Sequence, residues 1–120
     1  MKIANLTQHI STPEQKKAGV IDLNDRMNEI KILLTFDEIP SKNELVDRAI
    51  RLTKLCVEEG FEYAMIGGAP YFMPVLHSVL TEHGVKPLYA FSKRIVTEET
   101  QNDGSVKKVS KFIFEGFVEI

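Results

Sequence analysis

The sequence contains a single cysteine, Cys56, in 120 residues. One cysteine cannot form an intrachain disulfide, and it cannot build a zinc site from several cysteine ligands. The net charge of −2 gives no general basic surface for duplex nucleic acid. No apolar run approaches the roughly 20 residues that cross a membrane, and the first residues lack a signal-peptide pattern. We therefore expect a cytoplasmic protein whose partners include neither duplex nucleic acid nor a membrane.

Two nucleotide-binding motifs are also missing, the G-x-G-x-x-G fingerprint and the P-loop. The segment 62–74 has a related organisation, because residues 63–66 have the pattern of a buried strand and Gly67-Gly68 allows a sharp turn. Pro70 then suits the first position of a helix. A strand, a glycine turn and a helix start together bind anions or phosphates in open α/β proteins. The same pattern is equally that of a tight turn without a ligand.

The length predicts one domain spanning residues 1–120. Apolar segments predict strands at residues 2–6, 20–23, 63–66 and 87–91. Helix-start signals lie between them, at Thr12, at Asn24 or Asp25, at Ser41 and at Pro70. Strands that alternate with helices indicate an α/β fold with an open, mainly parallel sheet flanked by helices. Cys56 falls on the apolar face of the helix after Ser41, which favours a packed core cysteine over a nucleophile.

The last part of the chain predicts an antiparallel hairpin over residues 95–117. Asp103-Gly104 is a strong turn dipeptide. Neither face of the second arm is uniformly apolar before Phe112, so this arm should begin as an exposed ribbon and then enter the sheet. Such a ribbon would cover a ligand or contact a second subunit.

Three polar segments follow predicted strands that end at one edge of the sheet. In open α/β sheets, ligands bind at the carboxyl ends of the strands. The candidate ligand-binding residues are Asn5, Thr7, Gln8, Gly67, Gly68, Ala69, Pro70 and Ser92, and the candidate catalytic residues are His9, Lys93 and Arg94. Side-chain donors, backbone N–H groups and two cations suit an anionic ligand, and we expect a nucleotide or phosphodiester. Each member also has a structural explanation, since Asn5 and Thr7 can cap a turn and the two cations can be solvated at a strand end.

The two ends of the chain carry a family resemblance. Residues 5–9 and 12–15, and residues 87–94, 103–108 and 112–118, resemble the termini of small stand-alone CRISPR-associated proteins with a CARF-like, Rossmann-like fold. Glu115-Gly116 replaces the histidine usual there, and Gly67-Gly68-Ala69 replaces a more polar turn. Some members of that group are ring nucleases, which bind and cut cyclic oligoadenylate and so switch off CRISPR-linked antiviral signalling. The resemblance implies a CARF-like domain that binds cyclic oligoadenylate, with cyclic tetra-adenylate as the expected ring.

If the chain is such an enzyme, the expected chemistry needs no metal and no cofactor. The ribose 2′-OH of the ligand would attack the adjacent phosphate while the protein holds the two in line. Backbone N–H groups near Gly68 and the cations Lys93 and Arg94 would stabilise the developing charge, and His9 is the candidate acid or base. A ring with internal symmetry suits a homodimer. Two alternatives remain: a non-catalytic sensor or sequestering protein for a nucleotide messenger, and an accessory protein of a phage or plasmid with an unrelated small ligand.

Overall fold

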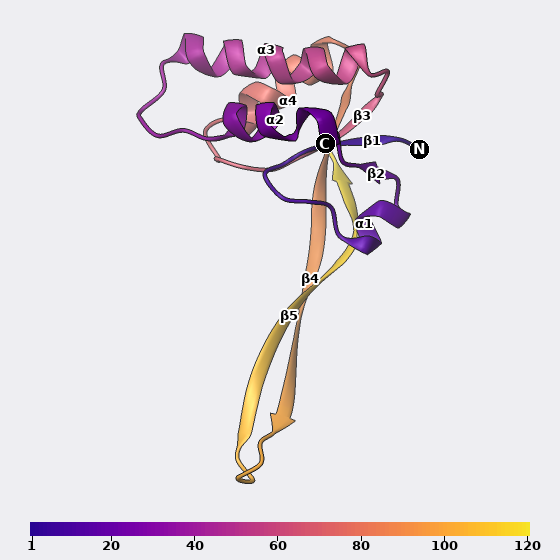
Figure 1. Ribbon diagram of the computed structural model, residues 1–120, viewed down its shortest axis with the longest axis vertical. Coiled ribbons are helices and arrows are strands. Elements are labelled where there is room, and N and C mark those ends of the chain that lie inside the picture. Colours follow the sequence, from indigo (N-terminus) through magenta and orange to yellow (C-terminus); the bar gives the residue numbers. More distant parts are fainter.

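The computed structural model describes residues 1–120, and its central feature is one five-stranded sheet. Figure 1 shows this sheet at the top of the molecule and a long ribbon leaving it. The elements in chain order are β1 (Ile3–Leu6), α1 (Pro13–Lys17), β2 (Val20–Ile21), the 3-10 helix η1 (Asn24–Arg26), α2 (Met27–Leu34), α3 (Lys42–Glu58), β3 (Tyr63–Ile66), α4 (Met73–Glu82), β4 (Lys86–Thr100) and β5 (Val106–Glu119). The strand order is β2-β1-β3-β4-β5. The first four strands are parallel, and β5 runs antiparallel to β4, so the predicted α/β class and mainly parallel sheet are confirmed.

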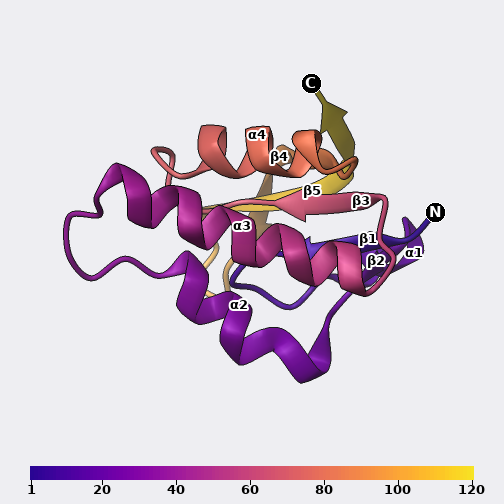
Figure 2. The same ribbon diagram turned by 90° about the horizontal axis from the view of Figure 1, so that it is seen from above.

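The main hydrophobic core lies on one face of this sheet. Alternate strand residues such as Ala4, Leu6, Ala64 and Ile66 point to that face, where they pack against buried residues of α2, α3 and α4. Figure 2 shows these three helices gathered along the sheet, with α1 apart from them at the β2 end. The helices have one apolar side each because their buried residues recur every three or four positions, as in Leu76, Val79 and Leu80 of α4.

The opposite face carries a smaller cluster formed by Ile3, Val20, Met65 and Leu88. The short helix α1 contacts both β2 and β5, which are the two edge strands, so it lies over this second face of a curled sheet. Helices therefore flank both faces, three on one side and one short helix on the other.

Two helix starts follow the sequence signals. The Thr12 side chain accepts the Gln15 backbone N–H at 3.2 Å, and the Gln15 side chain accepts the Thr12 N–H at 3.0 Å, which completes the predicted capping box of α1. At α3, the Ser41 hydroxyl accepts the Glu44 N–H at 3.1 Å. By contrast, α2 is entered through η1, and neither Asn24 nor Asp25 makes the predicted side-chain cap.

Two predicted boundaries are wrong. Helix α4 begins at Met73 and not at Pro70, because the N–H groups of Phe72 and Met73 both donate to the Ala69 carbonyl and close a separate turn first. The fourth strand does not stop at Phe91 but runs on to Thr100, because each of its later residues pairs with β5. A bulge between Phe91 and Ser92 marks the point where the strand leaves the body.

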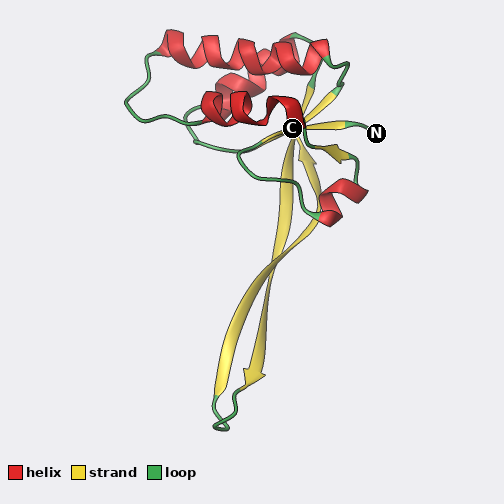
Figure 3. Ribbon diagram, viewed as in Figure 1, coloured by secondary structure: helices red, strands yellow, loops and turns green.

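The hairpin itself is confirmed as an exposed ribbon that enters the sheet at its base. Its turn occupies residues 101–105, and Gly104 has a φ of +87°, a conformation that glycine adopts easily. Figure 3 shows both arms as continuous strands extending far beyond the helices.

Candidate functional site

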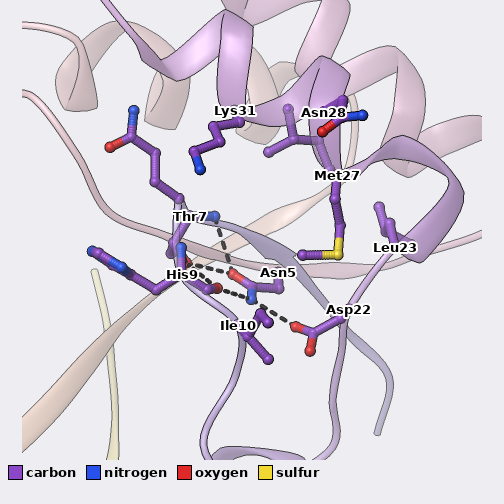
Figure 4. A pocket seen from close by; sticks show the side chains of 11 residues that line it. Asn5, Thr7, His9, Ile10, Asp22, Leu23, Met27, Asn28 and Lys31 are labelled. Carbon is purple, nitrogen blue, oxygen red and sulfur yellow. Dashed lines mark hydrogen bonds between the residues drawn. The ribbon is translucent and has the colours of Figure 1, made fainter.

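The candidate site is formed around the loop of residues 7–10, which follows β1. This loop is held by Asn5, a residue that is only 6% exposed. The Asn5 amide nitrogen donates to the His9 carbonyl at 2.7 Å and to Asp22 Oδ1 at 2.8 Å, and its oxygen accepts the Thr7 N–H and hydroxyl. Figure 4 shows these bonds converging on Asn5. Asn5 therefore uses its hydrogen-bonding capacity within the chain and positions the loop.

Asp22 anchors the same loop from the end of β2. Its carboxylate accepts the Asn5 amide and the Ser11 backbone N–H. Burial by itself would raise the pKa of Asp22, but the hydrogen bonds from Asn5 and Ser11 and the positive charge of Lys16 outweigh it and lower the pKa below its usual value. The loop is thus tied to β2 by a carboxylate that stays ionised at neutral pH.

The glycine turn after β3 lies beside this loop. Gly68 has a φ of +152°, which a side chain rarely allows, and a Cβ on Gly67 would meet the Thr7 methyl at 3.6 Å. The start of α4 offers few donors, because the N–H groups of Phe72 and Met73 are already bonded and Pro74 has none. The turn therefore shapes the floor of a hollow, and the first residues of α4 add few free N–H groups to it.

Two hollows flank the loop of residues 7–10. The first has a volume of about 350 Å³ and lies between the loop, Asp22 and α2 (Figure 4). The second has a volume of about 400 Å³ and lies between the loop, the start of α1 and the glycine turn. The second hollow is lined by Thr7, Gln8, His9, Ile10, Thr12, Gln15, Met65, Ile66, Gly67, Gly68, Tyr89 and Ala90.

The second hollow lies where the strand order reverses. The chain passes from β1 to β2 on one side of β1, and β3 lies on its other side. In open α/β sheets this reversal leaves a crevice at the carboxyl ends of the two central strands, which is the usual place for a ligand. The hollow is lined by residues from the carboxyl ends of β1 and β3, so it occupies that position.

The structure brings together five of the candidate residues and separates others. Thr7, Gln8, His9, Gly67 and Gly68 all line the second hollow. Ala69 packs against the main core instead, and Pro70 lies exposed in the following turn.

The three candidates from the fourth strand lie elsewhere. Ser92, Lys93 and Arg94 are exposed residues of β4, and none of them lines either hollow. The Arg94 guanidinium donates to the Ser110 hydroxyl across the ribbon at 3.0 Å. Their separation follows from the continuation of β4, which places them along the ribbon and not at a strand end.

Several lining residues were not foreseen from the sequence. Asp22 follows the strand Val20–Ile21 directly, so the rule that was applied to the other strand ends would have found it. Tyr89 lies inside a strand, where no local signal marks it. Its hydroxyl lies 2.9 Å from His77 Nδ1, the two rings stack, and burial raises the pKa of Tyr89. His77 is therefore packed against Tyr89.

Cys56 lies fully buried in the main core, as predicted. Burial raises the pKa of its thiol to about 12, so the thiolate that a nucleophile needs is scarce at neutral pH. No three side chains of the metal-binding types His, Cys, Asp and Glu gather in one place. No helix combines the length and the apolar character needed to cross a membrane.

Comparison with known proteins gives one result. No curated protein and no solved structure matches the chain. A family model does match it, and the match covers residues 1–118. The chain therefore belongs to the family described as the Uncharacterized protein MJ1673 family.

Proposed function

We propose that this protein binds a nucleotide messenger in the 400 Å³ hollow between the loop of residues 7–10 and the glycine turn. The observation that carries the proposal is the convergence of the loop and the turn on one hollow where the strand order reverses. We name cyclic oligoadenylate as the ligand class because the two ends of the chain resemble CARF-like, Rossmann-like CRISPR-associated proteins. Cyclic tetra-adenylate is the first ring to test.

The chemistry of the lining suits a ribose and a base. Hydroxyl and amide groups come from Thr7, Gln8, Thr12 and Gln15, and these groups both donate and accept hydrogen bonds. Tyr89 also lines the hollow, but its ring is already stacked on His77 of α4, so we assign it no contact with a base. Thr7 and Gly67 lie side by side in the lining, since a Cβ added at Gly67 would lie 3.6 Å from the Thr7 methyl.

A cleavage reaction in this hollow would depend on the ligand's own 2′-OH. The 2′ oxygen forms a bond to phosphorus while the bond from phosphorus to the 5′ oxygen breaks, giving a cyclic phosphate and a 5′-OH. His9 takes the proton from the 2′-OH and returns it to the leaving 5′ oxygen. Histidine suits this role because it titrates near neutrality. Lys93 and Arg94 lie on the ribbon, away from the hollow. In this proposal the protein therefore acts mainly by holding the 2′-OH and the phosphate in line.

A second function, binding without cleavage, has its own support. The lining of the hollow contains no lysine and no arginine, the residues that usually stabilise the negative charge in the transition state of phosphoryl transfer. A sensor or sequestering protein needs only affinity, which hydroxyl and amide groups can provide.

The two functions are separated by one incubation. The purified protein is mixed with cyclic tetra-adenylate in EDTA, the products are resolved by chromatography, and binding is measured by calorimetry. Linear products with a cyclic phosphate end support the nuclease, and intact ligand that co-elutes with the protein supports the binding protein. Absence of both binding and cleavage would refute cyclic oligoadenylate as the ligand.

Variants locate the site. Thr7→Val removes a hydroxyl from the lining together with its hydrogen bond to Asn5, and it should weaken binding roughly tenfold. His9→Ala should abolish cleavage with a smaller effect on binding. The matched control is His83→Ala, because His83 is an exposed histidine at the end of α4 outside both hollows. Equal loss from His83→Ala would contradict the placement of the site.

A further inference from the structure

The ribbon formed by β4 and β5 gives the molecule more surface than its size requires. Its radius of gyration is 17.1 Å, against about 14 Å for a compact domain of this length. Its accessible surface is 8036 Å², about 1,500 Å² above the value that size scaling gives. A standard interface buries about 800 Å² on each partner. The ribbon thus exposes enough area for a stable association.

One edge of the ribbon has no neighbouring strand. β3 pairs with β4 only from Lys86 to Leu88, so beyond that point β4 is paired on the β5 side alone. Unpaired strand edges present rows of free N–H and C=O groups that add further strands. A two-stranded hairpin is marginal in water by itself, so an added strand would stabilise this one.

Apolar side chains on the ribbon are exposed as well. Val96 on β4 is 52% exposed and Phe112 on β5 is 73% exposed. Both belong to the same face of the ribbon, because Arg94 lies opposite Phe112 and Val96 is two residues further along the strand. The ribbon therefore has both a free edge and an apolar surface beside it.

The charges along the free edge are self-complementary. The segment Lys93-Arg94-Ile95-Val96-Thr97-Glu98-Glu99 has two cations before its central valine and two anions after it. In an antiparallel pair of two such segments centred on Val96, Arg94 lies opposite Glu98 and Lys93 lies opposite Glu99. None of these four side chains forms an ion pair within its own chain, where all ion pairs lie among the helices. Opposite charges across strands stabilise a pairing, and like charges destabilise it.

We propose that the free edge of β4 pairs antiparallel with the same edge of a second copy of this chain, with the two-fold axis at Val96. The pairing joins the two ribbons into a four-stranded sheet, β5-β4-β4-β5. Within it, Glu98 lies between Lys108 of its own β5 and the partner's Arg94. The free edge of β5 is less suited to such a pairing. If two β5 strands paired antiparallel with Lys107 opposite Glu115, the two copies of Lys111 would lie opposite each other, and like charges destabilise a strand pair. The proposal stands independently of the ligand proposed above.

A charge-reversal experiment tests the register. An acidic chain carries Lys93→Glu and Arg94→Glu, and a basic chain carries Glu98→Lys and Glu99→Lys. Each should be monomeric by sedimentation at concentrations where the natural chain is a dimer, with association weakened roughly tenfold or more. A one-to-one mixture should form dimers again, since the residues at 93, 94, 98 and 99 of one chain then meet opposite charges on the other chain. Lys111→Glu is the matched control on β5 and should leave the natural dimer intact.

A crosslinking experiment tests the same register with the natural charges in place. Val96→Cys sets two thiols across the two-fold axis at a separation that a disulfide can span. Thr100→Cys is the control, because antiparallel pairing at Val96 keeps the two copies of residue 100 about 27 Å apart. Oxidation should link the Val96→Cys chain into covalent dimers and leave the Thr100→Cys chain unlinked, while buried Cys56 stays silent. A natural chain that sediments as a monomer throughout, or equal crosslinking of both variants, would overturn the proposal.

Discussion

At the scale of single residues, Asn5 holds the loop that forms the candidate site and also lines the first hollow. Its side chain joins the His9 carbonyl, the Asp22 carboxylate and the Thr7 N–H. Replacing Asn5 with alanine leaves these groups without partners in a buried place, so we expect a loss of roughly 2–4 kcal/mol of unfolding free energy. Urea denaturation measures it.

The matched comparison is Gln8→Ala, which removes another amide. The Gln8 side chain is exposed and bonds only to the exposed Thr35 hydroxyl. This change should stay within about 0.5 kcal/mol. Similar losses from the two variants would show that the Asn5 network does not hold the loop.

Asp22 predicts how stability depends on pH. Its pKa is lowered in the folded chain, because hydrogen bonds from Asn5 and Ser11 and the charge of Lys16 together overcome the effect of burial. The unfolded chain therefore binds the proton more readily, and the contribution of Asp22 is complete above its unfolded pKa of about 3.9. This stabilising contribution is lost as the pH falls through the lower pKa that Asp22 has in the folded chain. Urea midpoints between about pH 6 and pH 2 should fall less steeply for Asp22→Asn than for the natural chain, and parallel curves would contradict this account.

Gly19 is the glycine with the strictest requirement. Its φ is +110°, and a Cβ there would lie 2.1 Å from the carbonyl oxygen of Met1. We expect Gly19→Ala to cost roughly 3 kcal/mol or more, because strain and a backbone clash add together. Gly60→Ala provides the control, since Gly60 has a φ of +77° with nothing within 4 Å of the added Cβ. It should cost about 1–2 kcal/mol, and thermal melts of the two variants give the difference.

At the scale of elements, the sequence predicted correctly those features that depend on residues close together in the chain. The structure confirms the capping residues Thr12 and Ser41, the turn at Asp103-Gly104 and the core position of Cys56. The wrong predictions concern element boundaries that are set by contacts with other parts of the chain. The continuation of β4 beyond Phe91 depends on pairing with β5, and the delayed start of α4 depends on a turn closed by the Ala69 carbonyl.

The candidate site shows the same division. The loop after β1 and the glycine turn were identified because they follow strands that local patterns predict. Tyr89 and His77 meet only through packing of α4 on β4, which no spacing in the sequence records. The misplaced cations Lys93 and Arg94 followed from the misplaced end of β4.

Helix α3 allows a direct test of a cap. The Ser41 hydroxyl accepts the Glu44 N–H at the first turn. Ser41→Ala should lower the unfolding free energy by about 1 kcal/mol, because that N–H loses its partner. Ser78→Ala is the control: Ser78 is exposed inside α4, where alanine is the better helix former, so stability should stay the same or rise slightly. A loss from Ser78→Ala as large as that from Ser41→Ala would show that the cap is not the cause.

At the scale of the whole molecule, the body and the ribbon are separate in their stabilising contacts. The buried residues of the two hydrophobic clusters all lie before residue 89. Only Tyr89 and Phe117 pack against these clusters from later in the chain, and both are partly buried. Body and ribbon join where Phe91 lies opposite Gly116. The stability of the body should therefore depend little on the ribbon beyond this point.

Replacing residues 92–115 with a two-residue Asn-Gly turn tests this division. Asn-Gly favours the tight turn that connects adjacent antiparallel strands, so it can join Phe91 to Gly116 without altering the sheet. The shortened chain should unfold cooperatively with a midpoint close to that of the full chain, because no buried residue is lost. It should also sediment as a monomer at every concentration, since the edge centred on Val96 is gone. A shortened chain that does not fold would show that the ribbon supports the sheet, and one that still dimerises would place the interface on the body.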